Sequence, residues 1–260
     1  MMRKLALITG ASTGIGFELA TIAAQNGYDL LVAADEDLIN AAAADFGLND
    51  VDVMPVEVDL SSPAGVDHML RQLKGRPIDV LCANAGTGTG GAFLDHSWDT
   101  WRHSLDTNVT GTIYLLQEVL KQMIARGEGK ILVTGSIAGY IPGSFNAIYN
   151  ATKAFIDSFT DALRNELKDQ KNITLTTLLP GATDTEFFAR ADMLDTKVGA
   201  DVKKADPAKV AKDGWEAVMN GDDRVISGLF NKLQVAAAGV VPVGILAEAH
   251  RKLAEPGTAE

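Results

Sequence analysis

The sequence of 260 residues predicts a single α/β domain, a doubly wound parallel sheet of about seven strands with helices on both faces. Short apolar runs alternate along the chain with longer amphipathic ones, and parallel strands that are buried on both faces give near-continuous apolar runs of this kind. The length suits one large domain, and no linker divides it. Residues 1–260 are therefore expected to form one unit.

Seven apolar runs have the length of a strand. The first, KLALIT, ends at Gly10, and the second, DLLVAA, begins just after Gly27, which marks the end of a helix. Most of the others are rich in leucine or in β-branched residues, which favour strands. Strands are expected at residues 4–9, 29–34, 51–58, 77–83, 129–136, 173–180 and 223–227.

Amphipathic runs between these strands predict the helices. A glycine motif precedes the first helix, and Ser61 or Ser62 is the expected cap of the third. The two longest runs are each expected to be one continuous helix, and the second of them carries Tyr149 in its first turn. Helices are expected at residues 14–27, 36–47, 62–75, 98–126, 147–170 and 207–220.

Composition limits the classes of function. The formal net charge is -11 at pH 7, whereas nucleic acids and anionic membranes attract basic patches, so neither is an expected partner. The single cysteine, Cys82, excludes a disulfide framework and suits a reducing compartment. The apolar run near the N-terminus is too short for a signal peptide or a membrane span, which predicts a cytoplasmic protein.

Unusual residues stand at the carboxyl ends of six predicted strands. In a doubly wound sheet these ends meet at one edge, where ligands bind. The residues at these ends are Thr9-Gly10, Asp35, Asp59, Asn84-Ala85-Gly86, Ser136 and Pro180-Gly181. Their convergence predicts a ligand site at this edge of the sheet.

The stretch TGASTGIG, residues 9–16, carries glycines at positions 10, 14 and 16, between the first strand and the first helix. The spacing is GxxxGxG rather than the GxGxxG of the general dinucleotide fingerprint. The physical reason is shared, because glycines allow a tight turn and a close approach of the backbone to a pyrophosphate at a helix N-terminus. The motif predicts a bound dinucleotide.

With this loop, the motifs NAG, SIAG, YNATK and PGATDT occur in an order and at separations that resemble the short-chain dehydrogenase/reductase family, over about residues 4–186. The resemblance implies a Rossmann-like fold and an NAD(P)-dependent oxidoreductase that acts on CH–OH or C=O groups. One departure is Ala83, which stands where the family has the first asparagine of NNAG. That position is thought to brace the sheet, so cofactor binding is still expected.

The resemblance also implies the residues that contact the cofactor. Asp59 matches the contact to the adenine amine, Pro180, Gly181 and Thr183 match contacts near the nicotinamide, and Thr185 reaches a phosphate or the carboxamide. The expected cofactor-binding set is Gly10, Ser12, Thr13, Gly14, Ile15, Gly16, Asp35, Asp59, Leu60, Asn84, Ala85, Gly86, Tyr149, Lys153, Pro180, Gly181, Thr183 and Thr185.

The end of the second strand favours NAD over NADP. A carboxylate there accepts hydrogen bonds from the adenosine ribose and repels a 2′-phosphate. Asp35, Glu36 and Asp37 stand in a row, with no Arg or Lys near them in the sequence or in the glycine-rich loop. In the family the acid that selects NAD usually stands one residue earlier, where this chain has Ala34.

Tyr149 and Lys153 are one helical turn apart and face the same way. An ammonium near a phenol favours the phenolate, so the pKa of Tyr149 is expected to fall below its usual value of about 10. The resemblance implies that Tyr149 exchanges a proton with the substrate oxygen, Lys153 contacts the nicotinamide ribose, and Ser136 positions the substrate oxygen. It adds Asn108, which would hold a water in a proton relay.

The segment after PGATDT, residues 184–205, is expected to be the substrate loop and a mobile lid. Its phenylalanines and the residues between the catalytic Ser and Tyr predict an apolar pocket, hence a moderately apolar ketone or secondary alcohol. The expected pocket residues are Ser136, Tyr140, Phe145, Phe187 and Phe188. Arg190 is the nearest candidate to clamp a carboxylate.

No metal site is expected, because none of the four histidines has ligand spacing with another His, Cys or acid. Surface or packing roles are expected for them, and only His96 lies in a loop, residues 87–97, that could border the site.

The apolar C-terminal stretch, residues 228–255, is interrupted by Pro242 and is expected to be a pocket wall or a subunit contact, with peripheral membrane contact as the alternative. The resemblance implies a homodimer or homotetramer formed through helices 98–126 and 147–170. Two alternative functions remain: an NADPH-dependent carbonyl reductase, and a catalytically silent dinucleotide-binding regulator of the same fold.

Overall fold

Seven parallel strands form one sheet in the order β3-β2-β1-β4-β5-β6-β7 in the computed structural model, which describes residues 3–200 and 202–259. The order reverses between β1 and β4, which is the point where an open α/β sheet leaves a crevice for ligands. The strands are β1 Leu5–Thr9, β2 Asp29–Ala34, β3 Val53–Glu57, β4 Val80–Ala83, β5 Gly129–Thr134, β6 Ile173–Leu179 and β7 Arg224–Ile226. The predicted fold class is confirmed.

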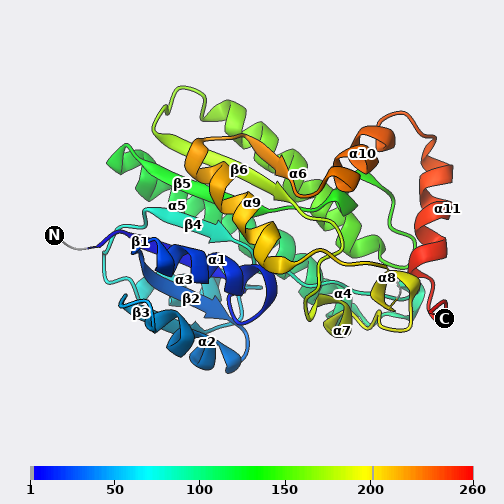
Figure 1. Cartoon of the computed structure of the whole chain (residues 1–260), viewed down its shortest axis with the longest axis horizontal. Helices are drawn as coiled ribbons and strands as arrows, with labels where there is room; N and C mark the ends of the chain where they lie inside the picture. Colours follow the sequence, from blue (N-terminus) through cyan, green and yellow to red (C-terminus); the bar gives the residue numbers. More distant parts are fainter. Residues whose placement is uncertain (1–2, 201, 260) are drawn as a thin grey trace.

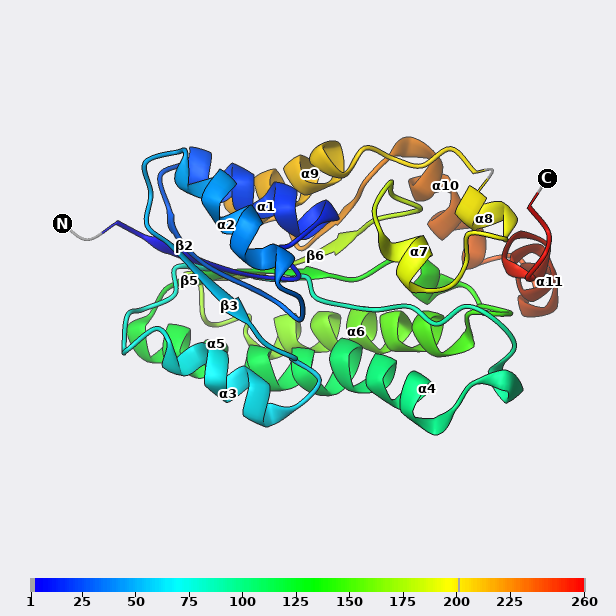
Figure 2. The ribbon, with the colours of Figure 1, turned by 90° about the horizontal axis from the view of Figure 1, so that it is seen from below.

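Helices cover both faces of the sheet, and each face has its own apolar core (Figure 2). On one face the strands pack against α1 Gly14–Gln25, α2 Leu38–Gly47 and α9 Pro207–Asn220. On the other face they pack against α3 Pro63–Arg71, α5 Thr112–Arg126 and α6 Ala147–Glu166. Both faces of the central strands are therefore buried, which explains why β1 and β2 are apolar almost throughout.

The segment 98–126 differs from the single helix that the sequence predicts. It consists of α4 Trp98–Leu105, the π-helical turn η2 Asp106–Gly111, and α5. The wider turn brings Gly111 against the chain after β3, where a Cβ on this glycine would lie 1.9 Å from the carbonyl oxygen of Leu60. Helical periodicity gives no sign of such a turn, although π-turns within helices often mark functional sites. Asn108 lies within it.

Short helices gather beyond the carboxyl ends of the strands (Figure 1). The expected substrate loop contains α7 Phe187–Arg190 and α8 Lys197–Ala200, while its residue 201 lies outside the described residues. The C-terminal stretch forms α10 Leu229–Ala238 and α11 Val243–Ala254, separated by Pro242 as the sequence predicts. Across the described residues, no helix has the length and apolarity that a membrane span requires.

Candidate active site

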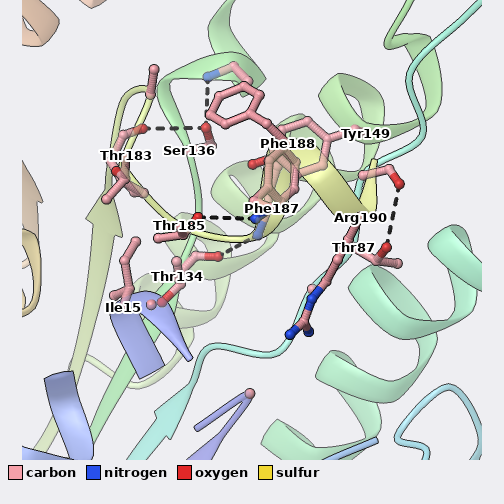
Figure 3. A pocket seen from close by; sticks show the side chains of 18 of the residues that line it. Ile15, Thr87, Thr134, Ser136, Tyr149, Thr183, Thr185, Phe187, Phe188 and Arg190 are labelled. Carbon is pink, nitrogen blue, oxygen red and sulfur yellow. Dashed lines mark hydrogen bonds between the residues drawn. The ribbon is translucent and has the colours of Figure 1, made fainter. Parts of the chain in front are cut away.

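The carboxyl ends of the strands surround a cavity of about 930 Å³ (Figure 3). Residues of α7, α10 and α11 also line it. Of the cofactor-binding residues predicted from the sequence, Gly16 alone is not in the lining. The others that line the cavity are Gly10, Ser12, Thr13, Gly14, Ile15, Asp35, Asp59, Leu60, Asn84, Ala85, Gly86, Tyr149, Lys153, Pro180, Gly181, Thr183 and Thr185. The structure thus brings residues from six strand ends around one space.

The glycine-rich loop has the shape of a phosphate cradle. Gly10 and Gly14 have φ angles of 65° and 59°, a conformation that residues with a Cβ rarely adopt. Gly16 lies beneath the loop, where a Cβ would stand 1.9 Å from the carbonyl oxygen of Gly10. Thr13 is the N-cap residue of α1, but its side chain accepts no hydrogen bond from the helix, and the first turn carries no acidic residue. The free N–H groups of this helix end fit a pyrophosphate.

Asn84 braces the strand ends around this loop. Its Nδ2 donates to the carbonyl oxygens of Thr9 at 3.1 Å and Gly10 at 3.3 Å, and its Oδ1 accepts from the Thr134 hydroxyl at 3.0 Å. One side chain therefore ties together the ends of β1, β4 and β5. Ala83, where the family resemblance expects a further asparagine, is buried at the end of β4 and leaves this bracing in place.

Tyr149, Ser136 and Lys153, which the sequence predicts to be catalytic, line the other end of the same cavity. The Lys153 side chain is buried, and its Nζ donates to the carbonyl oxygen of Thr134 at 2.8 Å. Ser136 caps the short helix η3 Ile137–Tyr140, because its Oγ accepts from the Ala138 N–H at 3.1 Å. The serine hydroxyl is thus held at the strand end, next to the tyrosine.

Asn108 lies behind the cavity wall rather than in the lining. Its Oδ1 accepts from the Thr87 N–H at 2.8 Å, and its Nδ2 donates to the Thr87 carbonyl at 2.8 Å and to the Thr152 hydroxyl at 3.0 Å. Asn108 Oδ1 and Lys153 Nζ flank Gly86, at 3.1 and 3.5 Å from where a Cβ would be. Asn108 therefore fixes the loop that follows β4, and the water relay stays a prediction.

The protonation of Tyr149 differs from what the Tyr–Lys spacing predicts. Burial raises the pKa of Tyr149 to about 12, and the Ser136 hydroxyl only partly offsets this. Lys153 Nζ stands 5.8 Å from the centre of the phenol ring and bonds to Thr134 instead. The expected lowering of the pKa is therefore wrong for the protein alone, because desolvation of the phenolate and the nearby charge of Asp157 both raise it.

Three aromatic rings gather on the substrate side (Figure 3). The ring of Phe187 lies 4.9 Å from that of Tyr149, and Phe188 meets Phe187 edge-on at 5.5 Å. Tyr140 and Phe145, also expected in the pocket, are not in the lining. The ring of Phe145 instead lies 5.0 Å from the Arg251 guanidinium, and its backbone has a φ of 61°.

Sequence reasoning did not anticipate the ion pair between Arg190 and Glu36. Arg190, at the end of α7, donates to Glu36 Oε1 at 2.7 Å across 154 residues of chain, and the Ser12 hydroxyl donates to the same oxygen at 2.5 Å. A cation therefore does stand at the end of β2, although none is near it in the sequence. Burial alone would raise the pKa of Glu36, but these two partners and the charge of Arg190 lower it.

The C-terminal helices supply part of the cavity wall, one of the two roles expected for this stretch. Phe230, Asn231 and Gln234 come from α10, and His250 and Leu253 come from α11. His250 Nδ1 lies 2.9 Å from the Ser144 carbonyl oxygen, and burial lowers the pKa of this histidine. His96, the histidine that the sequence places nearest the site, is not in the lining.

Comparison with known proteins agrees with this geometry. Residues 4–194 match the family described as short chain dehydrogenase. An uncharacterised short-chain type dehydrogenase/reductase from Sinorhizobium fredii is 37% identical over 189 residues, which are 72% of this chain and 73% of the relative.

Solved structures extend the likeness to nearly the whole chain. A short-chain dehydrogenase from Sphingobium yanoikuyae, in complex with NADPH, is 28% identical with a TM-score of 0.80 over 91% of this chain and 94% of that one. The bulky-bulky ketone specific alcohol dehydrogenase from Comamonas testosteroni is 25% identical with a TM-score of 0.77 over 91% of this chain and 93% of that one.

Proposed function

The chain belongs to the short-chain dehydrogenase/reductase family of oxidoreductases, and from this premise we propose that it interconverts a moderately apolar ketone and a secondary alcohol with a nicotinamide dinucleotide. The observation that carries the proposal is that Ser136, Tyr149 and Lys153 line one cavity together with the glycine-rich loop. The apolar wall around Phe187 and Phe188 supports a substrate of this class. The likeness to a ketone-specific alcohol dehydrogenase supports it too.

Residues at one end of the cavity bind the cofactor, and residues at the other end act on the substrate. The glycine-rich loop and the N-terminus of α1 bind the pyrophosphate. The nicotinamide, when bound, supplies or accepts the hydride. Ser136 binds and orients the substrate oxygen, and Tyr149 gives a proton to that oxygen or takes one from it. Lys153 sits between Tyr149 and the strand end and supplies positive charge beside the phenol.

The protonation of Tyr149 favours carbonyl reduction as the direction for which the protein alone is prepared. Burial raises the pKa of this phenol to about 12, so it carries its proton at neutral pH. A protonated phenol beside Ser136 is a proton donor for an oxygen that becomes an alcohol. Alcohol oxidation requires the phenolate, which the positive charge of an oxidised nicotinamide would favour.

For the cofactor we propose NAD(H). Asp35 is exposed into the cavity at the end of β2, where its carboxylate suits the ribose hydroxyls and repels a 2′-phosphate. NADPH is the second candidate, and one observation favours it: Arg190 stands at this end of the cavity and would attract a phosphate. Arg190 is already paired with Glu36, so the local charge remains negative and NAD is preferred.

Replacing the proton donor tests the proposal. The purified protein is screened with NADH and NADPH against a panel of ketones, and the Tyr149→Phe variant is compared with it. Loss of the hydroxyl should lower kcat by roughly 10²- to 10⁴-fold, the usual contribution of a general acid, and leave cofactor binding within a few-fold. Tyr140→Phe is the matched control, because Tyr140 lies outside the cavity lining.

A protein that binds NAD but turns over no substrate, with no change in Tyr149→Phe, would instead favour the silent regulator. In that case the cavity would serve as a sensor of the dinucleotide.

We further propose a homo-oligomer formed through α4, α5 and α6. Ile124 on α5 and Phe155 on α6 are exposed apolar side chains, and Phe155 stacks on Phe159 at 5.9 Å. Light scattering after gel filtration should give a dimer or tetramer, and Phe155→Glu should shift it toward the monomer, since burying an unpaired charge in an interface is costly. Phe230→Glu on α10 is the control, and a shift there alone would contradict the proposed surface.

A further inference from the structure

A buried carboxylate lies directly behind the catalytic residues. Asp157 is on α6, one helical turn after Lys153 and two after Tyr149, and it is 6% exposed. Neither of its oxygens has a hydrogen-bond partner of good geometry among the described residues. Buried carboxylates are nearly always paired, because removing a charge from water is costly. The unpaired carboxylate of Asp157 therefore needs an explanation from the residues around it.

Two glycines provide the space that this carboxylate fills. A Cβ on Gly135 would lie 1.9 Å from Asp157 Oδ1, and one on Gly139 would lie 2.6 Å from Oδ2. Gly135 stands between Thr134, which accepts the Lys153 hydrogen bond, and Ser136. The Asp157 carboxylate therefore packs beneath the strand end that holds both Lys153 and Ser136, and the nearby Ser136 N–H favours its charged form.

The charged and titratable groups around Asp157 come from three elements. They are Tyr149, Lys153 and Asp161 on α6, Tyr140 at the end of η3, and Arg224 on β7. Arg224 is committed to an ion pair with Asp161. Lys153 forms no ion pair with a carboxylate in the described part of the chain, and its Nζ donates to the neutral carbonyl oxygen of Thr134. Of the two cations that favour the charged form of Asp157, Lys153 therefore has the larger effect.

We propose that Asp157 is a positioning residue, a buried counter-charge that keeps Lys153 protonated and fixes the strand end of Ser136, a role that rests on the function proposed above. Burial lowers the pKa of Lys153, and the charge of Asp157 raises it again. Burial likewise raises the pKa of Asp157 above its usual value, and the Lys153 ammonium partly offsets this rise. Each charge thus stabilises the other in a place where neither is stable alone.

The test compares two charge removals on the same helix, Asp157→Asn and the control Asp161→Asn. Carbonyl reduction requires a protonated Tyr149 and a charged Lys153. In a plot of kcat/KM against pH, the alkaline limb therefore falls where either group loses its proton. Without the Asp157 charge both groups lose their protons at lower pH, because that charge raises the pKa of each. The alkaline limb should move down by roughly one pH unit or more in Asp157→Asn, and by much less in Asp161→Asn.

A second readout does not depend on turnover. The titration of Lys153 is followed by NMR on isotope-labelled lysine in the protein without cofactor, with Lys153→Arg to assign the signal. Its midpoint should fall in Asp157→Asn and return close to the wild-type value in Asp157→Glu, which restores the charge. If wild type reduces no ketone but the midpoint still falls, the proposed function fails while the role of Asp157 stands.

An unchanged Lys153 midpoint and an unchanged alkaline limb in folded Asp157→Asn overturn the proposal. If Asp157→Asn does not fold, Asp157→Ser removes the charge with a smaller side chain, and the same two readouts decide. A loss of stability with no shift of either midpoint would show that Asp157 acts only in packing.

Discussion

Burial acts on Tyr149 and Lys153 in the same sense, toward their uncharged forms. It raises the pKa of the phenol and lowers that of the ammonium. The carboxylate of Asp157 opposes this for Lys153 and reinforces it for Tyr149. The chemistry of the pair therefore depends on the charges placed around it as much as on the spacing of its two members. The same holds at the other end of the cavity, where Asp35 and Arg190 present opposite charges.

Reversing one charge should change the choice of cofactor. In Asp35→Arg the carboxylate that repels a 2′-phosphate becomes a guanidinium that binds it. The ratio of kcat/KM for NADPH to that for NADH should rise by about 10- to 100-fold, which corresponds to one hydrogen bond with a charged group. Steady-state kinetics with both cofactors measures this ratio.

Asp37→Arg is the control for this change. It adds the same charge two residues later, at the start of α2 and outside the cavity lining. A wild-type enzyme that already prefers NADPH would contradict the proposed role of Asp35 and would point to Arg190 as the phosphate-binding group.

Among the elements, the π-turn η2 connects the two ends of the site. Its Gly111 packs on the Leu60 carbonyl, next to the predicted adenine contact, and its Asn108 holds the Thr87 backbone beside the catalytic end. The extra residue in this turn moves Asn108 relative to a regular helix, since a π-turn rotates the residues that follow it.

Adding one methyl group to η2 should therefore disturb stability and site together. In Gly111→Ala the new Cβ would stand 1.9 Å from the Leu60 carbonyl oxygen, and backbone atoms would have to move. Unfolding in urea should show a loss of roughly 1–3 kcal/mol, as for other overpacked positions. Cofactor affinity should fall as well, because Leu60 lines the cavity.

Gly47→Ala is the matched control, since this glycine ends α2 with open space around it. Alanine there should leave stability unchanged or raise it by about 0.5–1 kcal/mol, as alanine does in helices. Equal losses in the two variants would show that the Leu60 contact is not tight.

Across the whole molecule, the two ends of the sheet have different tasks. The carboxyl ends surround the cavity, and the opposite ends are closed by a charged cluster around the buried Asp29. Its carboxylate accepts from Arg76 at 2.6 Å and from the Asp52 N–H at 3.0 Å, with Arg3 at 3.9 Å. Burial alone would raise the pKa of Asp29, but these partners together lower it. This cluster ties β2 to the segments before β1 and β4, far from the chemistry.

The lowered pKa of Asp29 gives the stability a defined pH dependence. A carboxyl whose pKa is lower in the folded state stabilises the fold above its usual pKa of about 3.9, and this contribution is lost as the pH falls below that value. Asp29→Asn should therefore cost roughly 2 kcal/mol at neutral pH, and the gap to wild type should narrow in acid.

Urea unfolding at several pH values measures this gap. Asp50→Asn is the control, because Asp50 pairs with the same Arg3 but has a fully exposed side chain, where ion pairs contribute little. A difference between Asp29→Asn and wild type that stays constant into acid would contradict the linkage.

The sequence predictions are accurate for features that residues close together in the chain determine. All seven strands lie within the runs that predict them. The signal is strongest for the central strands, because a strand buried on both faces must be apolar along its length. The positive φ angles of Gly10 and Gly14 follow from the need for glycine in a tight loop. The π-turn was not predicted, because it keeps the chain helical and changes only the local hydrogen bonding, which the apolar pattern does not report.

The sequence alone determined the order of strands and helices, the glycine-rich loop, and the grouping of Ser136, Tyr149 and Lys153 at one sheet edge. The signals for these features are apolar periodicity, glycine and short spacing, and each of them acts within a few residues along the chain. The tertiary structure alone decided the charges at the site. Folding brings Arg190 to Glu36 and packs the Asp157 carboxylate beneath the strand end of Ser136, and the protonation of Tyr149 depends on how much water the fold removes from it. Desolvation and Coulomb interaction act through space, and spacing along the chain does not encode either.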